Sequence, residues 1–425
     1  MKKQLMAGLL SASMLLSITA CAGNGANITT ANNISSEINV NENDLALVEL
    51  SDTDKENIGK ALADFSLNLM KENLKAKDKG VNVLVSPESV LYALSMTGNG
   101  ADNTTLTQFE SVLAGGESMG MVNSYLAKNM DETGNQLSLA NSIWIRDNAN
   151  RIQVNDDFLA LNKYVYDADA FKSAFDDTTL KDINGWVNEK TKGMIPSVLE
   201  YIDADAVMYL VNAAAFDAKW FEKYEDDDVK ENEIFYNYLG DEETVTMLMS
   251  TENQFIITED ATGFIKPYEG GGYAFVGILP NEGVDLNDYI ESLTGEAWLD
   301  MYYNAEDSSV AVWMPEFSDD YDIELSDALI NMGLEDAFHE GADFGKMAQT
   351  SSGSLYINRV IHKTHIDVDR NGTKAAAATV VEMTENCAIG EPIYDFVVLD
   401  RPFLYAIVDT NTGLPVFMGT VNSCQ

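Results

Sequence analysis

Four residues in one short segment have the types and spacing of a metal site. Asp367, Asp369, Asn371 and Gly372 form the pattern D-x-D-x-N-G, which opens a calcium loop with oxygen ligands at alternate positions. Such a loop needs Glu or Asp at its twelfth position to complete the coordination, and that position is Ala378. The segment therefore predicts no metal site.

The histidines could also serve chemistry, and two of the three, His362 and His365, have H-x-x-H spacing. In a strand, which the residues around them predict, side chains three residues apart point to opposite faces. We therefore expect His362 to be a structural residue. H-E-x-x-H and Walker-type motifs do not occur in the sequence, so we expect no enzyme activity, no cofactor and no metal.

The first cysteine, Cys21, ends an N-terminal targeting segment. The chain opens with Lys2 and Lys3, and an apolar run to Ala20 follows that is too short and interrupted for a strong membrane span. The small residues before Cys21 resemble a bacterial lipobox, which implies cleavage before Cys21 and diacylglycerol on its sulfur. We expect residues 1–20 to be a signal peptide. The protein is then exported and lipid-anchored on the extracytoplasmic cell surface, or secreted if the lipobox is not used.

The rest of the chain divides into a tether and one large domain. Residues 21–50 are rich in Asn, Ser, Thr and Gly without a hydrophobic period, which predicts a flexible tether. No second low-complexity linker or solenoid repeat follows, so residues 51–425 are expected to form a single domain.

The composition restricts the possible partners. The chain has 26 Lys and Arg against 69 Asp and Glu, a formal net charge of −43 that repels nucleic-acid phosphates and anionic lipid headgroups. Because 46% of its residues are hydrophobic, it is not an acidic disordered protein. We expect a globular monomer that binds no nucleic acid and meets a membrane only through a lipid anchor.

The residue patterns predict an α+β fold. Apolar residues at three- and four-residue spacing from Ile58 to Leu69 predict a helix, and Ser86 before Pro87 predicts the N-cap of another. Further helices are expected over 182–198 and 322–338. Strands are expected over the Val-, Ile-, Tyr- and Phe-rich stretches 137–145, 208–216, 274–279, 310–314, 355–368 and 396–421, with Asn411-Thr412-Gly413 as a hairpin turn.

One segment, residues 372–386, has both helix and strand signals. The run Ala375–Ala378 favours a helix. Alternate residues from Thr373 onward are uncharged, however, whereas Lys374 and Glu382 fall in the other set, as in a strand with one buried face. Such a conflict is typical of a segment that changes conformation.

Seven motifs, in the order of one family, resemble those of the serpins from about residue 55 to the C-terminus. They are Asn82-Val-Leu-Val-Ser86-Pro87-Glu-Ser89, Ile183–Ile195, Val211–Trp220, Met314-Pro315-Glu316-Phe317, His362-Lys363-Thr364, Gly372–Thr379 and Arg401-Pro402-Phe403. The resemblance implies an α+β serpin fold with three β-sheets, a large central sheet, about eight or nine helices and an exposed reactive-centre loop. It also implies suicide inhibition, in which a protease cleaves the loop, is trapped as an acyl-enzyme and is carried away as the loop inserts into the central sheet.

The resemblance gives roles to three groups of residues in this cycle. The hinge, whose small side chains let a strand enter a packed sheet, is Gly372, Thr373, Lys374, Ala375, Ala376, Ala377, Ala378 and Thr379. The shutter, whose hydrogen bonds tie the sheet to the helix beneath, is Ser86, Ser89, Asn212 and His362. The breach, where insertion begins, is Trp220, Glu316 and Arg370.

Counted from Gly372 as in the family, the reactive bond lies between Asn386 and Cys387. The bonds Met383-Thr384 and Glu385-Asn386 stay open as alternatives. The Val and Met residues upstream suit an elastase-like or subtilisin-like protease better than a trypsin-like one, and a protease that prefers Glu or Asn stays open as an alternative. The thiol of Cys387 is open to three interpretations: a reactive group, a small apolar residue, or one half of a disulfide with Cys424.

Three charges differ from the pattern of inhibitory serpins. Arg370 stands where those proteins usually carry Glu, and Glu316 stands where the partner is usually basic, so we expect an ion pair of reversed sign at the top of the sheet. Lys374 likewise replaces the usual Glu after the hinge Thr. The main hypothesis is an inhibitor of a serine, or alternatively a cysteine, endopeptidase. These charges keep open a non-inhibitory serpin that acts as a binding or carrier module.

Overall fold

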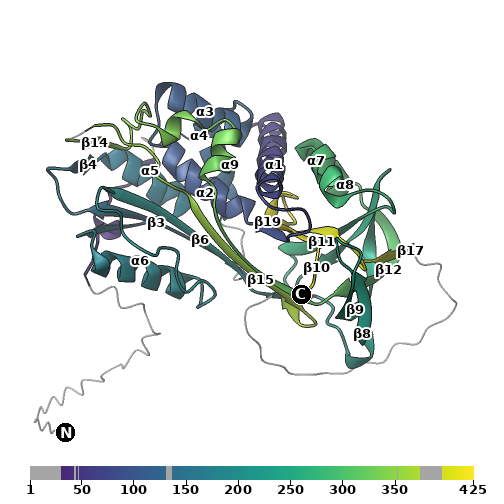
Figure 1. The fold of residues 1–425 in the computed structure, drawn as a ribbon. Coiled ribbons are helices and arrows are strands. Elements are labelled where there is room, and N and C mark those ends of the chain that lie inside the picture. The colour runs from purple at the N-terminus through teal and green to yellow at the C-terminus, as the bar shows by residue number, and fades with distance from the viewer. Residues whose placement is uncertain (1–29, 43–44, 46, 131–135, 352, 374–394) are drawn as a thin grey trace, which may run out of the picture.

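The computed structural model describes residues 30–42, 45, 47–130, 136–351, 353–373 and 395–425. Within these ranges the chain forms a set of helices beside one nine-stranded sheet and two four-stranded sheets (Figure 1). The helices are α1 (Asp52–Lys75), α2 (Pro87–Gly98), α3 (Asn103–Ala114), α4 (Met119–Met130), α5 (Asp156–Tyr166), α6 (Asp177–Lys190), α7 (Leu286–Ser292), α8 (Gly295–Tyr303) and α9 (Ser326–Asn331). No helix in the described ranges is long and apolar enough to cross a bilayer.

The largest sheet has nine strands and holds much of the core. Its order is β17 (Asp395–Val398), β12 (Glu306–Pro315), β9 (Glu242–Ile257), β10 (Ala261–Pro267), β11 (Tyr273–Pro280), β18 (Phe403–Asp409), β19 (Pro415–Val421) and β2 (Val83–Val85), with β8 (Val229–Tyr236) beside β9. All residues of β11 and β19 are buried, as expected for strands covered on both faces. The expected hairpin turn joins β18 to β19, with Gly413 at φ +65°.

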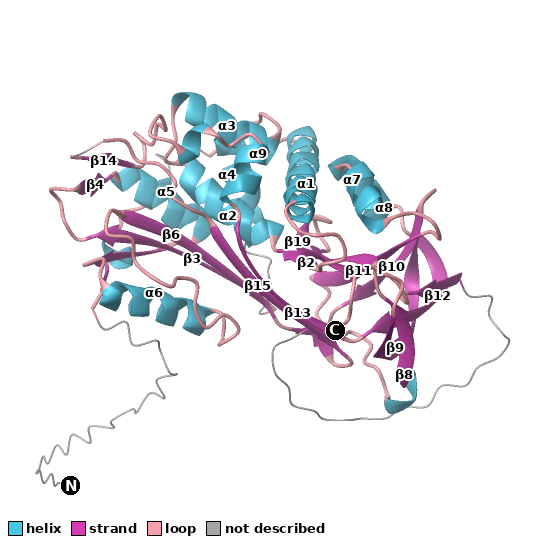
Figure 2. Ribbon diagram, viewed as in Figure 1, coloured by secondary structure: helices cyan, strands magenta, loops and turns pink. Residues whose placement is uncertain are grey.

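Two four-stranded sheets adjoin one another and carry the residues of interest (Figure 2). One has the order β1 (Asn32–Asn33), β5 (Asp169–Ser173), β3 (Leu137–Arg146) and β6 (Met208–Phe216). The other has the order β13 (Phe317–Glu324), β15 (Ile361–Asp369), β16 (Gly372–Thr373) and β7 (Ala218–Lys219). Only Asp217 separates β6 from β7, so the two sheets are joined at this point. A two-stranded pair, β4 (Ile152–Val154) with β14 (Ala348–Thr350), lies apart.

Strands β6 and β15 run beside one another in Figure 1, but no ladder pairing joins them in the described residues. The expected large central sheet is therefore present as two halves with a seam between β6 and β15. Helix α6 covers one face of β3, where Trp186 joins Trp144 and Phe171 in a small apolar cluster. The other helices lie on the opposite side of these strands (Figure 2).

Several elements lie where the sequence predicts them, and two helices do not. The Ser86 side chain caps α2, and β3 and β6 match the expected strands 137–145 and 208–216. The helix expected over 182–198 begins earlier, at Asp177, because Asp176 caps it, and it ends at Lys190, before Lys192 and Gly193 adopt positive φ angles.

The helix expected over 322–338 is wrong. Its first residues belong to β13, which pairs with β15 along its whole length from Phe317 to Glu324. This pairing buries Tyr321 and overrides the helical spacing of the residues. Only the short α9 and a single 3₁₀ turn (Asp336–Phe338) follow, and Gly333 at φ +114° separates them.

The flexible tether expected over residues 21–50 is also wrong for the described residues 30–37. β1 adds antiparallel to the edge strand β5, and Ile34 is buried at 6% exposure. The Thr30 hydroxyl donates to Asp182 Oδ2 on α6 at 2.5 Å. Polar composition suggested a loose segment, but a free sheet edge supplies backbone partners that do not depend on side-chain hydrophobicity.

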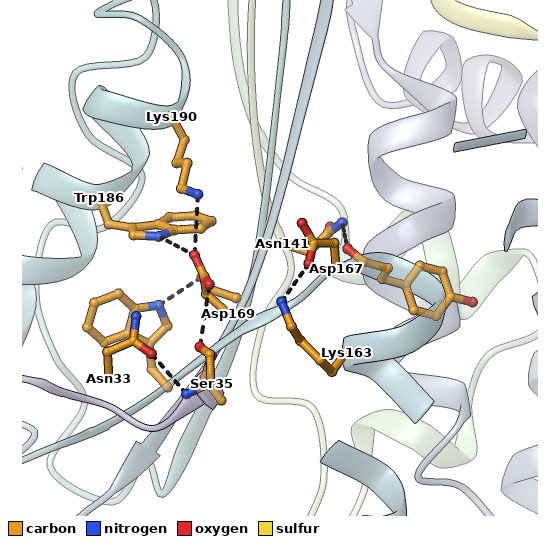
Figure 3. A network of polar contacts seen from close by, with 12 residues as sticks. Asn33, Ser35, Asn141, Lys163, Asp167, Asp169, Trp186 and Lys190 are labelled. Carbon is orange, nitrogen blue, oxygen red and sulfur yellow. Dashed lines mark hydrogen bonds and ion pairs between the residues drawn. The ribbon is translucent and has the colours of Figure 1, made fainter. Parts of the chain in front are cut away.

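Asp169 joins this N-terminal segment to helix α6 (Figure 3). One carboxylate oxygen accepts from the Ser35 hydroxyl at 3.4 Å. The other accepts from Trp186 Nε1 at 3.3 Å and lies 3.3 Å from Lys190 Nζ, both on α6. The segment is thus bound to the edge of the sheet and, through Asp169, to the helix that covers it.

Candidate functional site

The first two residues of the predicted hinge already lie inside a sheet. Gly372 and Thr373 form β16, which pairs antiparallel with β15 on one side and with β7 on the other. Thr373 is buried at 2% exposure, on the inward face that alternation predicts. A Cβ at Gly372 would collide with the carbonyl oxygen of Ala218, so the close approach of β7 requires glycine here. Lys374, Ala375, Ala376, Ala377, Ala378 and Thr379 lie outside the described residues.

A small hollow, with room for about one water molecule, lies beside Thr373. Its apolar walls are Phe216 on β6, Ile366 on β15, and Ile407 and Phe417 of the nine-stranded sheet, and His365 and Asp367 on β15 also line it. The hollow lies at the seam between β6 and β15. A strand that continues from β16 would pass between these two strands, with its inward side chains facing the apolar part of this lining.

Asp369 turns the chain from β15 into β16. Its Oδ1 accepts from the Asn371 and Gly372 amides at 2.6 and 3.1 Å, and its Oδ2 accepts from Asn371 Nδ2 at 3.0 Å. The carboxylate of the D-x-D-x-N-G pattern is therefore committed to an Asx turn. In the described part of the chain, no group of three or more His, Cys, Asp or Glu is placed to hold a metal.

Trp220, the predicted breach tryptophan, is fully buried and holds this turn from the side. Its indole Nε1 donates to the Asp369 carbonyl at 2.8 Å, and its backbone amide donates to the Asn371 carbonyl at 3.1 Å. The indole ring stacks on Tyr268, with centroids 4.6 Å apart and planes 11° from parallel.

The ion pair of reversed sign is present. Arg370 Nε lies 3.8 Å from Glu316 Oε1, and the Arg370 backbone amide donates to the same oxygen at 3.1 Å. Burial raises the pKa of Glu316, and Arg370 acts in the opposite direction. The guanidinium also lies 3.5 Å from the exposed Asp226, so one cation bridges two carboxylates across the turn.

The four predicted shutter residues form one hydrogen-bonded cluster below the seam. The Ser86 amide donates to His362 Nε2 at 3.0 Å, and the Ser86 hydroxyl donates to the Val416 carbonyl at 2.8 Å. The Ser89 hydroxyl donates to Asn212 Oδ1, and Asn212 Nδ2 donates to Asn141 Oδ1 at 2.6 Å. The N-terminus of α2 is thereby tied to strands from both halves of the divided sheet.

His362 is neutral in this cluster. Burial lowers its pKa to about 4, and accepting a hydrogen bond at Nε2 places the remaining proton on Nδ1. His365 points to the other face of β15, where its Nδ1 lies 2.8 Å from Asp320. The two histidines therefore share no ligand.

Three residues near the breach were not predicted. Tyr268 lies against Trp220 and shares a hydrogen bond with Thr373, and Lys266 and Glu252 form a buried ion pair at 2.7 Å beneath Trp220. Nothing in the sequence distinguishes Tyr268 from the other seventeen of 18 tyrosines, because its partners lie far away along the chain.

A G-x-S-x-G match that sequence reasoning missed runs from Gly116 to Gly120. A nucleophile elbow needs its Ser on a turn between a strand and a helix. Ser118 instead lies between α3 and α4, and its Oγ accepts from the Met121 amide at 3.4 Å at the start of α4. The match therefore has no catalytic context.

The remaining predicted residues lie outside the described part of the chain. They are Cys21, Met383, Thr384, Glu385, Asn386 and Cys387. Cys424 is a free, partly buried thiol, and burial raises its pKa to about 12.

Comparisons with known proteins agree with this arrangement. A family model described as Serpin (serine protease inhibitor) matches residues 60–424. Serpin B6 of Pongo abelii is 32% identical over 394 residues, which cover 86% of this chain and 99% of that protein. Alpha-1-antichymotrypsin of Homo sapiens is 30% identical over 387 residues, covering 86% and 88% of the two chains.

A solved structure is also similar along almost the whole chain. The native state of tengpin, a thermophilic serpin, is 42% identical, has a TM-score of 0.83 and covers 93% of this chain and 100% of its own. The family match begins within α1 and spans the later helices, the three larger sheets apart from β1, and the hinge described above. The chain therefore belongs to the serpin family.

Proposed function

We propose that this protein is a suicide-substrate inhibitor of a serine, or alternatively a cysteine, endopeptidase. The observation that carries the proposal is the position of β16: Gly372 and Thr373 lie between β7 and β15, at the seam where no ladder pairing joins the described residues of β6 and β15. A loop with its first two residues paired on both sides can extend the same ladder once a protease cuts it. Membership of a family of protease inhibitors supports the same conclusion.

The register of β16 tells where an inserting loop would go. Thr373 pairs with Ala218 and Val368, and continuing this antiparallel register brings Thr379 level with Asn212 and His362. The loop would therefore have to pass between the two halves of the shutter cluster. The hydrogen bonds from Ser86 and Ser89 to these halves give that passage an energy barrier, since a buried group that loses its partner costs about 1–3 kcal/mol.

The target and the location belong to the proposal as well. Val380, Val381 and Met383 favour an elastase-like or subtilisin-like protease, and the bond between Asn386 and Cys387 is the proposed site of cleavage. Diacylglycerol on Cys21 would hold a monomeric inhibitor on the extracytoplasmic surface. Cys21→Ala is expected to move the protein from the membrane fraction to the soluble fraction, and loss of fatty acid from the purified protein is the direct measurement.

Incubation with proteases of different specificity tests the proposed inhibition. The purified protein is mixed with elastase-, subtilisin-, trypsin-, papain- and Glu-specific enzymes, followed by denaturing gels and intact-mass analysis. The expected result is a covalent complex with at least one enzyme, with a released C-terminal peptide whose mass identifies the bond.

The second candidate is a non-inhibitory serpin that acts as a binding or carrier module. The reversed charges at Arg370 and Glu316 and the unusual Lys374 are the features that favour it. Cleavage within residues 380–390 with neither a covalent complex nor a gain in heat stability would reject trapping and leave this second function.

A further inference from the structure

Tyr268 is placed to hold Thr373, the second residue of the hinge. Its hydroxyl shares a hydrogen bond of 2.5 Å with Thr373 Oγ1, although the two residues are 105 positions apart. Tyr268 is 0% exposed and Thr373 is 2% exposed, so water cannot replace the bond without entering the core. The two hydroxyls are thus hydrogen-bonded to each other in the protein interior.

The ring of Tyr268 is fixed by its neighbours on two sides. Trp220 stacks on one face at 4.6 Å, and Phe216 meets the ring edge-on at 5.0 Å. Trp220 is itself held by Lys266, whose ammonium lies 5.5 Å from the indole and is paired with the buried Glu252. The Tyr268 hydroxyl is therefore a preorganised group.

The backbone also pairs the hinge with its neighbours. Within the described residues, Gly372 and Thr373 of β16 pair with β15 on one side and β7 on the other, after the chain reverses within two residues of Asp369. The buried side-chain hydrogen bond of Thr373 further stabilises the hinge in its paired position. This stabilisation is lost when the hinge leaves the sheet.

We propose that Tyr268 is a positioning residue for loop insertion, which keeps Thr373 engaged in the sheet so that insertion begins from the correct register. This proposal rests on the proposed inhibitory function. It predicts that losing the bond lets the hinge leave the sheet more often. A loop cleaved in that state inserts more slowly, and the acyl-enzyme has more time to hydrolyse.

Three substitutions and one control test the bond. Tyr268→Phe keeps the ring stack and removes the hydroxyl, and Thr373→Val keeps the shape of the side chain and removes its hydroxyl. Thr373→Ser keeps the hydroxyl and removes only the methyl group. Tyr289→Phe is the matched control, because the buried Tyr289 hydroxyl donates to Met301 Sδ on α8, away from the hinge.

The first measurement is hydrogen exchange of the backbone amides of residues 366–373 in the free protein. Tyr268→Phe and Thr373→Val should each exchange about five-fold faster, the equivalent of ~1 kcal/mol for one buried hydrogen bond. Thr373→Ser and Tyr289→Phe should behave like the wild type. The double variant, which combines Tyr268→Phe with Thr373→Val, should recover part of the protection. Replacing both partners by apolar groups leaves no unpaired hydroxyl.

The second measurement is the number of inhibitor molecules consumed for each protease molecule trapped. This number should rise several-fold in both single variants and fall back in the double variant. Wild-type exchange rates in both single variants, or a double variant as impaired as the sum of the two, would overturn the proposal. If the wild type traps no protease, the inhibitory function fails, but hydrogen exchange still decides whether Tyr268 holds the hinge.

Discussion

At the scale of single residues, the cluster around Asn212 does the most to join separate elements. Its amide accepts from Ser89 on α2 and donates to Asn141 on β3, so both ends are committed to buried or partly buried partners. Asn141 in turn donates to the Tyr166 carbonyl at 2.8 Å. Loss of one member leaves several polar groups without partners.

Asn212→Ala is therefore expected to lower the free energy of unfolding by about 1–3 kcal/mol. Urea titration followed by circular dichroism measures the change. Asn281→Ala is the control, because Asn281 makes one exposed hydrogen bond to the Glu259 carbonyl and its loss should stay within about 0.5 kcal/mol. Equal effects of the two substitutions would contradict the structural weight given to the cluster.

His362 predicts a dependence of stability on pH. Its pKa is about 4 in the folded protein and about 6.5 when exposed, so the unfolded chain binds the proton first as pH falls. Stability is then lost between pH 6.5 and pH 4, by at most about 3 kcal/mol.

Comparison with His362→Gln isolates this contribution, because Gln can still accept from the Ser86 amide. The pH dependence of the unfolding free energy should be shallower in His362→Gln than in the wild type. The comparison is needed because Asp319, whose pKa burial raises to about 6, acts in the opposite direction. His339→Gln, which replaces an exposed histidine, is the control and should keep the wild-type slope.

At the scale of elements, the N-terminal segment 30–37 has a structural role that its polar composition did not indicate. Deleting residues 30–37 removes β1 and the buried Ile34 and should cost about 2–4 kcal/mol, the range expected for one buried aliphatic side chain with several hydrogen bonds. Thermal unfolding of this deletion, beside a deletion of residues 22–29, measures the difference. A deletion of 30–37 as stable as the control would show that β1 adds little.

The same elements show how far a sequence can be interpreted. Strands β3 and β6 were predictable because apolar residues predominate in both, and the α2 cap because Ser86 precedes Pro87. β13 was not predictable, since Asp and Glu residues occupy half of it and only its pairing with β15 makes it a strand. The shutter and hinge positions followed from the resemblance of this chain to the serpins. Tyr268 followed from neither pattern nor resemblance, because its function depends on a contact across 105 residues.

At the scale of the whole molecule, the charge of −43 should govern how fast a protease arrives. Unlike charges accelerate encounter and like charges retard it, and salt screens both effects. The second-order rate of complex formation with a basic protease should fall at least ten-fold between 25 and 500 mM salt, where the Debye length shrinks from roughly 20 Å to roughly 4 Å. A neutral protease of the same specificity is the control, and an equal salt dependence for both would exclude steering.

The position of β16 also relates the site of cleavage in the loop to the length of the strand that would insert. Because Thr373 is fixed between β7 and β15, every residue between it and the cut bond adds one step of about 3.3 Å to the inserted strand. A cut after Asn386 corresponds to a strand of about 43 Å, and a cut after Met383 to one about 10 Å shorter. Under the proposed inhibitory function, the position of the scissile bond thus decides not only which protease attacks but also how far along the sheet the captured enzyme comes to rest.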